Sequence, residues 1–458
     1  MSLWTAAEIA AATGGVASAD FTVDGVAFDS REIGPGDLFV AMKGAATDGH
    51  LFLDQVFARG AGGAIVSAPC DGPHVRVADT AAALEALGRA ARARMLGAVI
   101  GVTGSMGKTG TKEMLFAALD RAAPGTAHRS VKSYNNHTGV PLSLARMPGP
   151  MRYGVFEMGM NHAGELAALT QQVRPHVAII TTVAPVHIEF FASEAAIADA
   201  KAEIFEGLEP GGTAIIPHDN GHRDRLIEAA RRAGARIVTF GLGEGADVRA
   251  LETMRSDSGG TFVTARLLGR ELGFTIGQPG AHLVGNALAV LAAVEAVGAD
   301  VAIAGLALAD MAGLAGRGAR MRVALADGGT ALVIDESYNA NPGSMRGTLA
   351  MLAAEPATRR IAVLGEMREL GEHSAGFHAD LAGPVLAAGV RHGILVGEAM
   401  TPLANALEGQ GDFVHVADAA AARERLIALL ADGDAILVKG SNGVGLAAVV
   451  AGLGEMQA

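Results

Sequence analysis

The sequence has a single cysteine, Cys70, so the chain cannot form an internal disulfide. Its longest apolar helical stretch, Leu283 to Val294, ends at Glu295 and is too short to cross a bilayer. The first residues lack the basic and apolar segments of a secretory signal. With 36 basic and 48 acidic residues, the chain also lacks the positive surface that nucleic acids require. These absences predict a soluble cytoplasmic protein with no membrane insertion and no nucleic-acid partner.

Lysine is also scarce. Only six of the 36 basic residues are lysines, and the other 30 are arginines. A coding bias across the genome would explain this preference for arginine. Under such a bias, the remaining lysines are candidates for sites that arginine cannot fill. They are Lys43, Lys108, Lys112, Lys132, Lys201 and Lys439.

The length of 458 residues favours about three domains, at the usual ~150 residues each. Residues 1–95 mix short β-type runs with turn signals, which predicts a small N-terminal α/β module. In residues 96–314, buried-strand runs alternate with helical stretches, which is typical of a doubly wound parallel sheet. The period-two pattern of residues 246–276 predicts an antiparallel hairpin at one sheet edge. Arg317 to Arg322 is predicted to be a glycine-rich linker at the start of the last domain, residues 315–458. Strands and helices alternate in the rest of that range, which predicts a Rossmann-like α/β domain.

The strongest local signal is a glycine-rich turn between a buried strand and a helix. Backbone N–H groups and the helix dipole make such a turn a cradle for phosphate. Lys108 would reach the terminal phosphates, and the Thr109 hydroxyl would face Mg²⁺. The loop is a variant, because Val102 stands where the full P-loop pattern has glycine. The predicted nucleotide-binding residues here are Thr103, Gly104, Ser105, Met106, Gly107, Lys108, Thr109 and Gly110.

Three further polar residues follow predicted elements of the same sheet. Glu157 and His187 stand at strand ends, and Lys201 lies on a helix. Ligands of open parallel sheets bind at the carboxyl ends of the strands, so we expect Glu157 and His187 near the phosphate loop. Taken singly these signals are weak, because such a histidine is more often structural and a helical lysine is usually solvated.

The motifs taken together closely resemble those of the Mur ligases, over essentially the whole chain. The resemblance rests on the variant loop and on the segments Asp29 to Arg31, Pro35 to Ala41, Asp48 to His50, Asn135 to Pro141, Glu157 to Glu165, His187 to Glu189, Lys201 to Phe205 and Asp335 to Pro342. The segment Asn339 to Met345 is most similar to the branch that joins D-alanyl-D-alanine to a UDP-N-acetylmuramoyl tripeptide. This resemblance implies an ATP-dependent amide ligase of peptidoglycan synthesis, which is a monomer and phosphorylates a carboxylate before an amine attacks it.

The resemblance also implies two metal ions and four catalytic residues, Lys108, Glu157, His187 and Lys201. In the family one Mg²⁺ is held by residues matching Thr109 and Glu157. A second ion is held by residues matching His187 and Lys201, the lysine being carbamylated with CO₂. A carbamate supplies anionic oxygen ligands, and only an amine that can deprotonate forms one, which arginine effectively cannot.

Other matched positions imply contacts with the nucleotide and the substrates. Asn286 corresponds to an asparagine near the adenine, although Leu283 departs from the family pattern just before it. Arg317 and Asp335 correspond to residues that reach the nucleotide from the C-terminal domain, which we expect to close over ATP about a hinge near Arg317. The implied substrate residues are Ser30, Arg31 and His50 for the UDP-sugar and Asn339 and Asn341 for the incoming dipeptide. Asn136, Thr138, Asn161 and His162 are also implied to bind substrate. Ser30, Arg31, Asn339 and Asn341 are equally typical of turns.

Several alternatives stay open from the sequence. A ligase that adds a diamino acid to the UDP-muramoyl dipeptide, or a folylpolyglutamate synthase, would keep the fold and change the amine. An ATP-dependent switch protein would need the phosphate loop but would have no use for His187 and Lys201 together. A dinucleotide-binding dehydrogenase is disfavoured, because residues 440–445 do not match the G-x-G-x-x-G motif of such proteins and no acidic residue follows at the required spacing.

Overall fold

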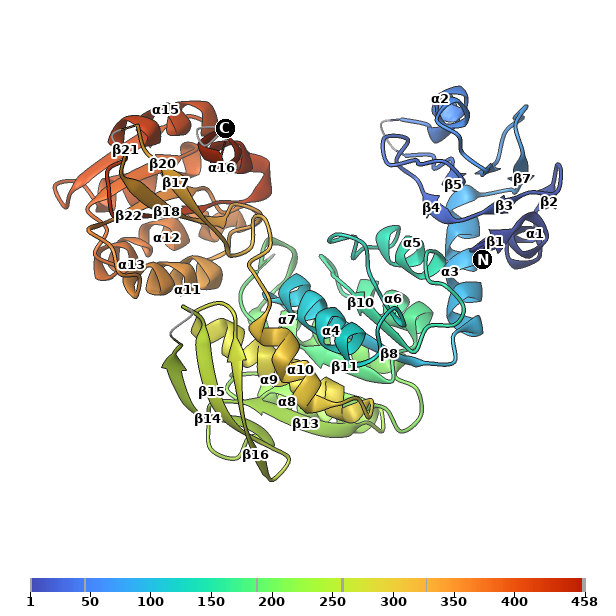
Figure 1. The fold of residues 1–458 in the computed structure, drawn as a ribbon, viewed down its shortest axis with the longest axis horizontal. Helices are drawn as coiled ribbons and strands as arrows, with labels where there is room; N and C mark the ends of the chain where they lie inside the picture. Colours follow the sequence, from blue (N-terminus) through green and yellow to red (C-terminus); the bar gives the residue numbers. More distant parts are fainter. Residues whose placement is uncertain (1, 45–46, 187, 257–258, 327, 455–458) are drawn as a thin grey trace.

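The structure is a computed structural model and describes residues 2–44, 47–186, 188–256, 259–326 and 328–454. Three α/β domains follow one another along the chain (Figure 1). The N-terminal and C-terminal domains stand as two arms on the central domain, and together they form a V. The fold class predicted from the sequence is confirmed.

The N-terminal domain contains a five-stranded sheet in the order β2-β7-β6-β5-β4 and a two-stranded pair, β1-β3. Its core packs Trp4, Ile9 and Leu84 against the sheet, and it also includes Leu142 and Ala145 from helix α5 (Gly139–Ala145) of the central domain. The elements are β1 (Trp4–Thr5), α1 (Ala6–Thr13), β2 (Val16–Ala17), β3 (Thr22–Val23), β4 (Gly25–Ala27), β5 (Asp37–Val40), the 3-10 turn η1 (Gly49–Phe52), α2 (Leu53–Ala58), β6 (Gly63–Val66), β7 (His74–Arg76) and α3 (Thr80–Arg94).

The central domain is built on a nine-stranded sheet in the order β16-β15-β14-β13-β12-β11-β8-β10-β9. Strands β8 to β14 pair in parallel. The antiparallel hairpin predicted at one edge is confirmed, and the structure extends it to two successive hairpins, β14-β15-β16. One face is covered by α4, α9 and α10, and the other by α5 to α8. The elements are β8 (Ala98–Thr103), α4 (Lys108–Ala122), β9 (Ala127–Arg129), α5 (Gly139–Ala145), β10 (Tyr153–Glu157), α6 (Glu165–Val173), β11 (Val177–Ile180), η2 (Ile188–Phe190), α7 (Glu194–Ala202), η3 (Glu203–Gly207), β12 (Thr213–Pro217), α8 (Arg223–Arg232), β13 (Arg236–Gly241), β14 (Val248–Arg255), β15 (Thr261–Leu267), β16 (Arg270–Ile276), α9 (Ala281–Ala296) and α10 (Val301–Ala309).

The C-terminal domain has a six-stranded sheet in the order β17-β18-β22-β19-β20-β21, parallel except for β17. Helices cover both of its faces. The elements are β17 (Ala319–Ala324), β18 (Thr330–Glu336), α11 (Pro342–Ala353), β19 (Arg359–Gly365), η4 (Gly371–His373), α12 (Ser374–Ala379), α13 (Ala382–Ala387), β20 (His392–Val396), η5 (Glu398–Met400), α14 (Thr401–Ala406), β21 (Asp412–Val416), α15 (Ala419–Leu429), β22 (Asp434–Lys439), η6 (Asn442–Val444) and α16 (Ala447–Gly454).

The linker predicted at Arg317 to Arg322 is only partly correct. The structure places Ala319–Ala324 in strand β17, which pairs with β18 along its whole length. The connection between the domains therefore lies earlier and ends at Gly318, whose N–H donates to the Asp335 carbonyl. The glycines that suggested a linker provide a turn with positive φ at Gly316 and Gly318, just before an edge strand.

None of the helices in the described part of the chain is both long enough and apolar enough to cross a membrane.

Candidate active site

The phosphate loop connects the buried strand β8 to the N-terminus of α4, as the sequence predicts. Gly104 has φ +149, and a Cβ there would lie 1.9 Å from the Thr181 hydroxyl, so the loop can pass this close only as glycine. No side chain of the described residues caps the N-terminus of α4. The hydroxyl of Thr103 is buried and has no partner in the described part of the chain. Free helix N–H groups and an unpaired buried hydroxyl at a glycine turn fit a bound phosphate.

Lys108, the first residue of α4, folds back over this loop. Its Nζ donates to the Gly104 carbonyl at 2.7 Å. Burial lowers the pKa of Lys108, while Glu157 opposes this shift and Arg317 adds to it. Ser105 fastens the other side of the loop, because its hydroxyl donates to the Ala184 carbonyl at 2.9 Å. The loop is therefore held in shape by its own contacts.

Glu157 ends strand β10 beside the loop, and only 1% of it is exposed. Its carboxylate accepts hydrogen bonds from the Thr109 hydroxyl at 2.9 Å and from the Asn135 amide at 2.8 Å. A hydroxyl and a carboxylate are oxygen ligands of the kind Mg²⁺ prefers. The described residues contain no group of three or more His, Cys, Asp or Glu side chains that could hold a metal alone. The donor set thus fits an ion that takes its other ligands from nucleotide phosphates and water.

Lys201 lies near the end of α7 and is only 3% exposed. Its amine makes no hydrogen bond or ion pair with any residue that the structure describes. Burial, and then the positive charge of Lys108, lower the pKa of Lys201 well below its usual range. The neutral amine, which a carbamate requires, is therefore favoured. His187, the predicted partner of Lys201 at a second metal ion, lies outside the described residues.

Two of the residues predicted to contact the nucleotide, Arg317 and Asn286, lie close to the phosphate loop. The Arg317 guanidinium stacks on the Tyr338 ring, 4.1 Å from its centroid, and donates to the Ser133 hydroxyl at 3.3 Å. That hydroxyl is 3.4 Å from the Thr109 hydroxyl. The Asn286 amide lies against Gly107, where a Cβ would come within 2.9 Å of it. Arg317 and Asn286 are therefore beside the glycine-rich loop that is predicted to bind nucleotide.

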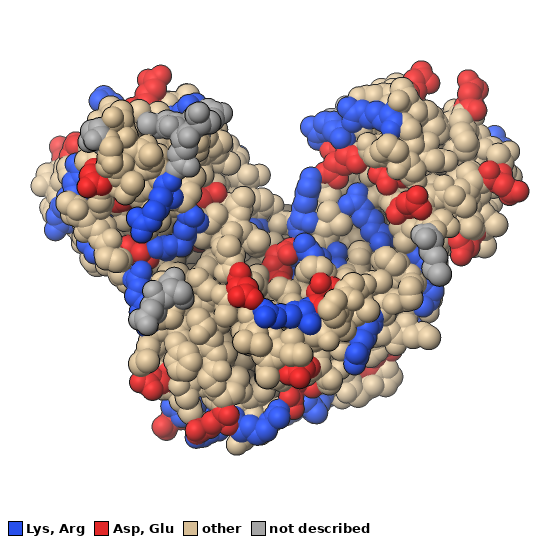
Figure 2. All heavy atoms as spheres, viewed as in Figure 1, with Lys and Arg blue, Asp and Glu red and all other residues tan. Residues whose placement is uncertain are grey.

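Asp335 has a different environment. Its carboxylate accepts hydrogen bonds from the Gly316 N–H at 2.6 Å and from the Ser337 hydroxyl at 2.6 Å, so it braces the connection between domains. The C-terminal domain also reaches the loop at the start of α11, where a Cβ on Gly343 would lie 2.9 Å from the Met106 methyl. Figure 2 shows the molecule hollowed between the two arms, with Lys and Arg side chains gathered along the walls.

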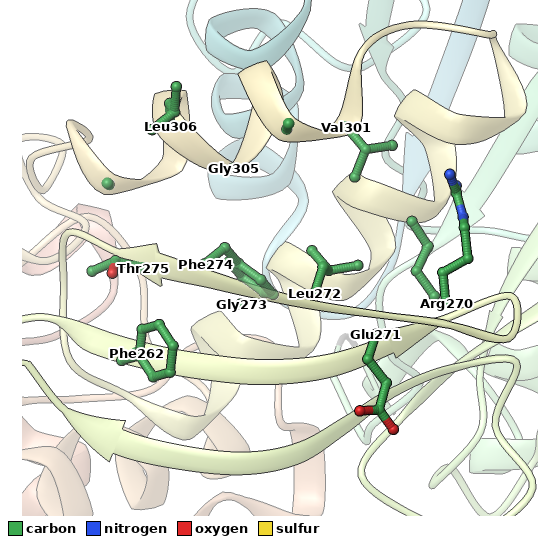
Figure 3. A pocket seen from close by; sticks show the side chains of 13 residues that line it. Phe262, Arg270, Glu271, Leu272, Gly273, Phe274, Thr275, Val301, Gly305 and Leu306 are labelled. Atoms are coloured by element: carbon green, nitrogen blue, oxygen red, sulfur yellow. The ribbon is translucent and has the colours of Figure 1, made fainter.

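A separate apolar groove of about 580 Å³ lies between the β15–β16 hairpin and α10 (Figure 3). Phe262, Leu272 and Leu306 line it. Of its two charged lining residues, Arg270 pairs with Glu295 at 2.7 Å and Glu271 pairs with Arg266 at 3.2 Å. Because a reaction site needs polar groups that converge on a ligand, this groove is not the candidate active site.

Comparison with known proteins agrees with the geometry of the loop. Three family models match in order along the chain: "Mur ligase family, catalytic domain" over residues 22–99, "Mur ligase middle domain" over 102–294 and "Mur ligase, glutamate ligase domain" over 319–442. The UDP-N-acetylmuramoyl-tripeptide–D-alanyl-D-alanine ligase of Escherichia coli is 36% identical over 446 residues, 96% of each chain. The chain belongs to the Mur ligase family.

Solved structures extend the similarity. The crystal structure of MurF from Acinetobacter baumannii matches this Mur ligase with a TM-score of 0.85 and 32% identity, over 99% of each chain. MurF from Thermotoga maritima in complex with ADP shares the fold, with a TM-score of 0.77 and 24% identity over 94% of this chain and 98% of the other. The ligase from Bacillus subtilis with the same name as the E. coli relative is 33% identical over 78% of this chain and 76% of its own.

The predicted UDP-sugar residues of this Mur ligase lie in the N-terminal domain. Arg31 is exposed and forms an ion pair with Asp29 at 2.6 Å, while Ser30 stands between them in the chain. His50 is held on both ring nitrogens: Nε2 accepts from the Ser67 N–H at 2.9 Å, which leaves Nδ1 to donate to Asp48 at 2.6 Å. Their role in binding a substrate stays a prediction.

The other predicted substrate residues take part in local structure. The Asn136 amide oxygen accepts from the Thr138 hydroxyl at 3.0 Å and from the Gly139 N–H at 2.9 Å, at the start of α5. Asn161 and His162 are both exposed, and the His162 ring contacts Phe190. Asn341 is the N-cap of α11 and forms a capping box with Ser344. Its observed contacts are therefore those of a local structural residue, the alternative that the sequence left open. The exposed Asn339 supplies its carbonyl to the Lys439 ammonium at 2.9 Å.

Sequence reasoning gave no site role to several polar residues around the loop. Ser133 connects Thr109 with Arg317. Lys112 is fully buried behind the loop, and the buried Lys439 pairs with Glu336 at 3.3 Å. The signal that could have found the two lysines is the scarcity of that residue in the chain.

Proposed function

We propose that this Mur ligase uses ATP to join D-alanyl-D-alanine to a UDP-N-acetylmuramoyl tripeptide, through an acyl phosphate, in peptidoglycan synthesis. The observation that carries the proposal is the grouping of Thr109, Glu157 and Lys108 at a preformed phosphate loop, with a buried Lys201 that has no partner among the described residues. The choice of amine is supported by the end-to-end similarity to ligases of that name.

The reaction brings two anions together, the substrate carboxylate and the terminal phosphate of ATP. The Lys108 ammonium and the N–H groups of the loop would stabilise the charge that develops on the transferred phosphoryl group. Thr109 and Glu157 would hold a Mg²⁺ ion, which supplies Lewis-acid neutralisation of phosphate charge when bound. The dipeptide amine would then attack the acyl carbon, expel phosphate and form the amide.

Lys201 would serve as a second metal ligand after carbamylation, together with His187. In that step the Nζ lone pair forms an N–C bond to CO₂ and the nitrogen loses a proton, so a neutral amine becomes an anion. The burial of Lys201 and its lowered pKa support this role, because CO₂ reacts with the unprotonated amine.

The same proposal divides the substrates among the domains. Residues 1–95 would bind the UDP-sugar, residues 96–314 would bind ATP, and residues 315–458 would bind the dipeptide and close over the nucleotide about the connection near Arg317. The reaction would take place in the cytoplasm, and the enzyme would work as a monomer.

Phosphate release with each candidate amine tests the proposal. We expect turnover with D-alanyl-D-alanine and the UDP-muramoyl tripeptide, and little with meso-diaminopimelate or L-glutamate. Preference for either of those two amines would replace the proposal with one of the rival ligases.

A Lys201→Ala variant separates a ligase from an ATP-dependent switch. We expect near-complete loss of ligation, with partial return when a small carboxylate is added to fill the vacated position. Unchanged turnover of ATP in this variant would favour the switch. Lys43→Ala, at an exposed lysine, is the matched control and should leave ligation unchanged.

A further inference from the structure

The turn formed by residues 130–135 lies between the phosphate loop and the N-terminal domain, and it is anchored from behind. The Lys112 ammonium, fully buried on α4, donates to the Ser130 carbonyl at 3.2 Å and to the Lys132 carbonyl at 2.5 Å. Lys132 has φ +50, an uncommon left-handed conformation for a residue that is not glycine. Such a conformation persists when several contacts fix the surrounding chain.

Three side chains of this turn contact the metal and nucleotide side of the site. The Ser130 hydroxyl accepts from the Glu157 N–H at 3.0 Å, and the Asn135 amide donates to the Glu157 carboxylate at 2.8 Å. Ser133 lies between Thr109 and Arg317. The turn therefore holds the carboxylate and the hydroxyl proposed to carry Mg²⁺.

Two other side chains of the turn, those of Lys132 and Tyr134, contact the N-terminal domain at one carboxylate. Glu32 accepts a hydrogen bond from the Lys132 ammonium and another from the Tyr134 hydroxyl, the latter at 2.9 Å. The Tyr134 ring also packs against Phe28, with ring centroids 5.7 Å apart. Lys132 lowers the pKa of Glu32 against the opposing effect of burial, so Glu32 is an anion at neutral pH.

Glu32 takes only a limited part in the contacts that seat the N-terminal domain as a whole: the Arg146 guanidinium, at the end of α5, lies 3.9 Å from its carboxylate. That seat includes apolar residues shared with α5, the Trp4 indole N–H, which donates to the Ala145 carbonyl at 2.8 Å, and the Arg146 guanidinium, which donates to the Val26 carbonyl. The hydrogen bonds of the Glu32 carboxylate come from the active-site turn, which contains Lys132 and is anchored by Lys112 of α4, two of the six lysines of the chain.

We propose that Glu32 is a positioning residue for the metal and nucleotide site. Through Lys132 and Tyr134 it fixes the turn 130–135, and the turn fixes Glu157 and Thr109. Docking of the domain proposed to bind the UDP-sugar is thereby coupled to the geometry of the site proposed to bind Mg²⁺ and ATP. The inference rests on the proposed function for the identity of these ligands.

The test measures Mg²⁺-dependent binding of a fluorescent ATP analogue, mant-ATP, to the full chain. We expect Glu32→Ala to raise the Mg²⁺ concentration for half-maximal binding about two- to thirty-fold, the range of positional couplings that act through intermediate residues. In ligation assays the same variant should lower kcat and leave the KM for D-alanyl-D-alanine unchanged. Glu32→Asp should recover part of the Mg²⁺ affinity.

Two controls keep a positioning role apart from a structural one. Trp4→Phe removes a docking hydrogen bond without touching the turn, and Glu85→Gln alters an exposed ion pair in the same domain. Neither should shift the Mg²⁺ requirement. An equal shift in Glu32→Ala and Trp4→Phe would show general loosening of the domain and overturn the proposal, as would no shift in Glu32→Ala.

A double-mutant cycle that combines Glu32→Ala with Ser133→Ala is a second test of the proposal. Coupled residues give non-additive effects, so the double variant should lose less Mg²⁺ affinity than the two single losses combined. Additive losses would contradict the proposal.

If Glu32→Ala fails to fold, Lys132→Met replaces it, because the Lys132 side chain is 63% exposed. Failure of the wild type to ligate D-alanyl-D-alanine would refute the proposed function. The mant-ATP titration tests the positioning role of Glu32 separately, because no amine substrate takes part in it.

Discussion

The central domain contacts its two neighbours in different ways. Toward the N-terminal domain, α5 contributes Leu142 and Ala145 to a core that both domains share. Toward the C-terminal domain the contacts are small and mostly polar: Arg317 on Ser133, Met106 beside Gly343, and Arg255 on the Ala354 carbonyl at 3.0 Å. A shared apolar core resists separation, while a few polar contacts can break and re-form at low cost. From this difference we propose that the C-terminal domain is the arm that moves.

The largest expected effect comes from the shared core. Leu142→Ala should destabilise the protein by about 2–5 kcal/mol, because a buried leucine is replaced by a cavity. The loss should appear as a lower midpoint for a transition that includes the N-terminal and central domains together, measured by urea unfolding with probes in each. Separate unfolding transitions of the N-terminal and central domains in the wild type would contradict a core that the two domains share.

Acid should weaken the same side of the molecule. His128 has a pKa lowered from 6.5 to about 4, chiefly by burial, and it contacts the Ser143 carbonyl of α5 at 2.8 Å. The unfolded chain binds the proton more tightly, so the stability from neutral His128 is complete above pH 6.5 and is lost as the pH falls toward 4. The loss is on the order of 2–3 kcal/mol, at 1.36 kcal/mol per pKa unit.

Urea midpoints at pH 7 and pH 4.5 measure this effect. His128→Gln should flatten the dependence, while His162→Gln, at an exposed histidine, should leave it as in the wild type. The same acid sensitivity in the His128→Gln variant would show that another group is responsible.

The smallest effect on stability is expected at the C-terminal interface. Arg255 is 43% exposed and contacts Glu355 at 3.4 Å, so Arg255→Ala should cost no more than about 1 kcal/mol. The variant should still shift the distribution of domain positions, seen in small-angle scattering as a larger radius of gyration without nucleotide. Identical curves for the variant and the wild type, with and without an ATP analogue, would contradict a moving C-terminal arm.

Local patterns in the sequence account for much of the site. The loop from Thr103 to Gly110 and the strand that ends at Glu157 could be predicted because each depends on neighbouring residues. The linker at Arg317 to Arg322 was placed too late, since glycines before an edge strand resemble a flexible connection. The contact of Glu32 with Lys132 spans 100 residues, and neither residue has a local signal for the other. Asn341 could not be assigned from sequence because a cap and a substrate contact need the same side chain.

The most direct test of the central claim is a crystal structure of the protein with Mg²⁺ and a non-hydrolysable ATP analogue, prepared in the presence of bicarbonate. The account predicts the triphosphate over Gly104 to Thr109, a metal ion on Thr109 and Glu157, and density for a carboxylate extending from the Lys201 amine to a second ion. An unmodified Lys201 remote from any metal, with the nucleotide bound elsewhere, would contradict it.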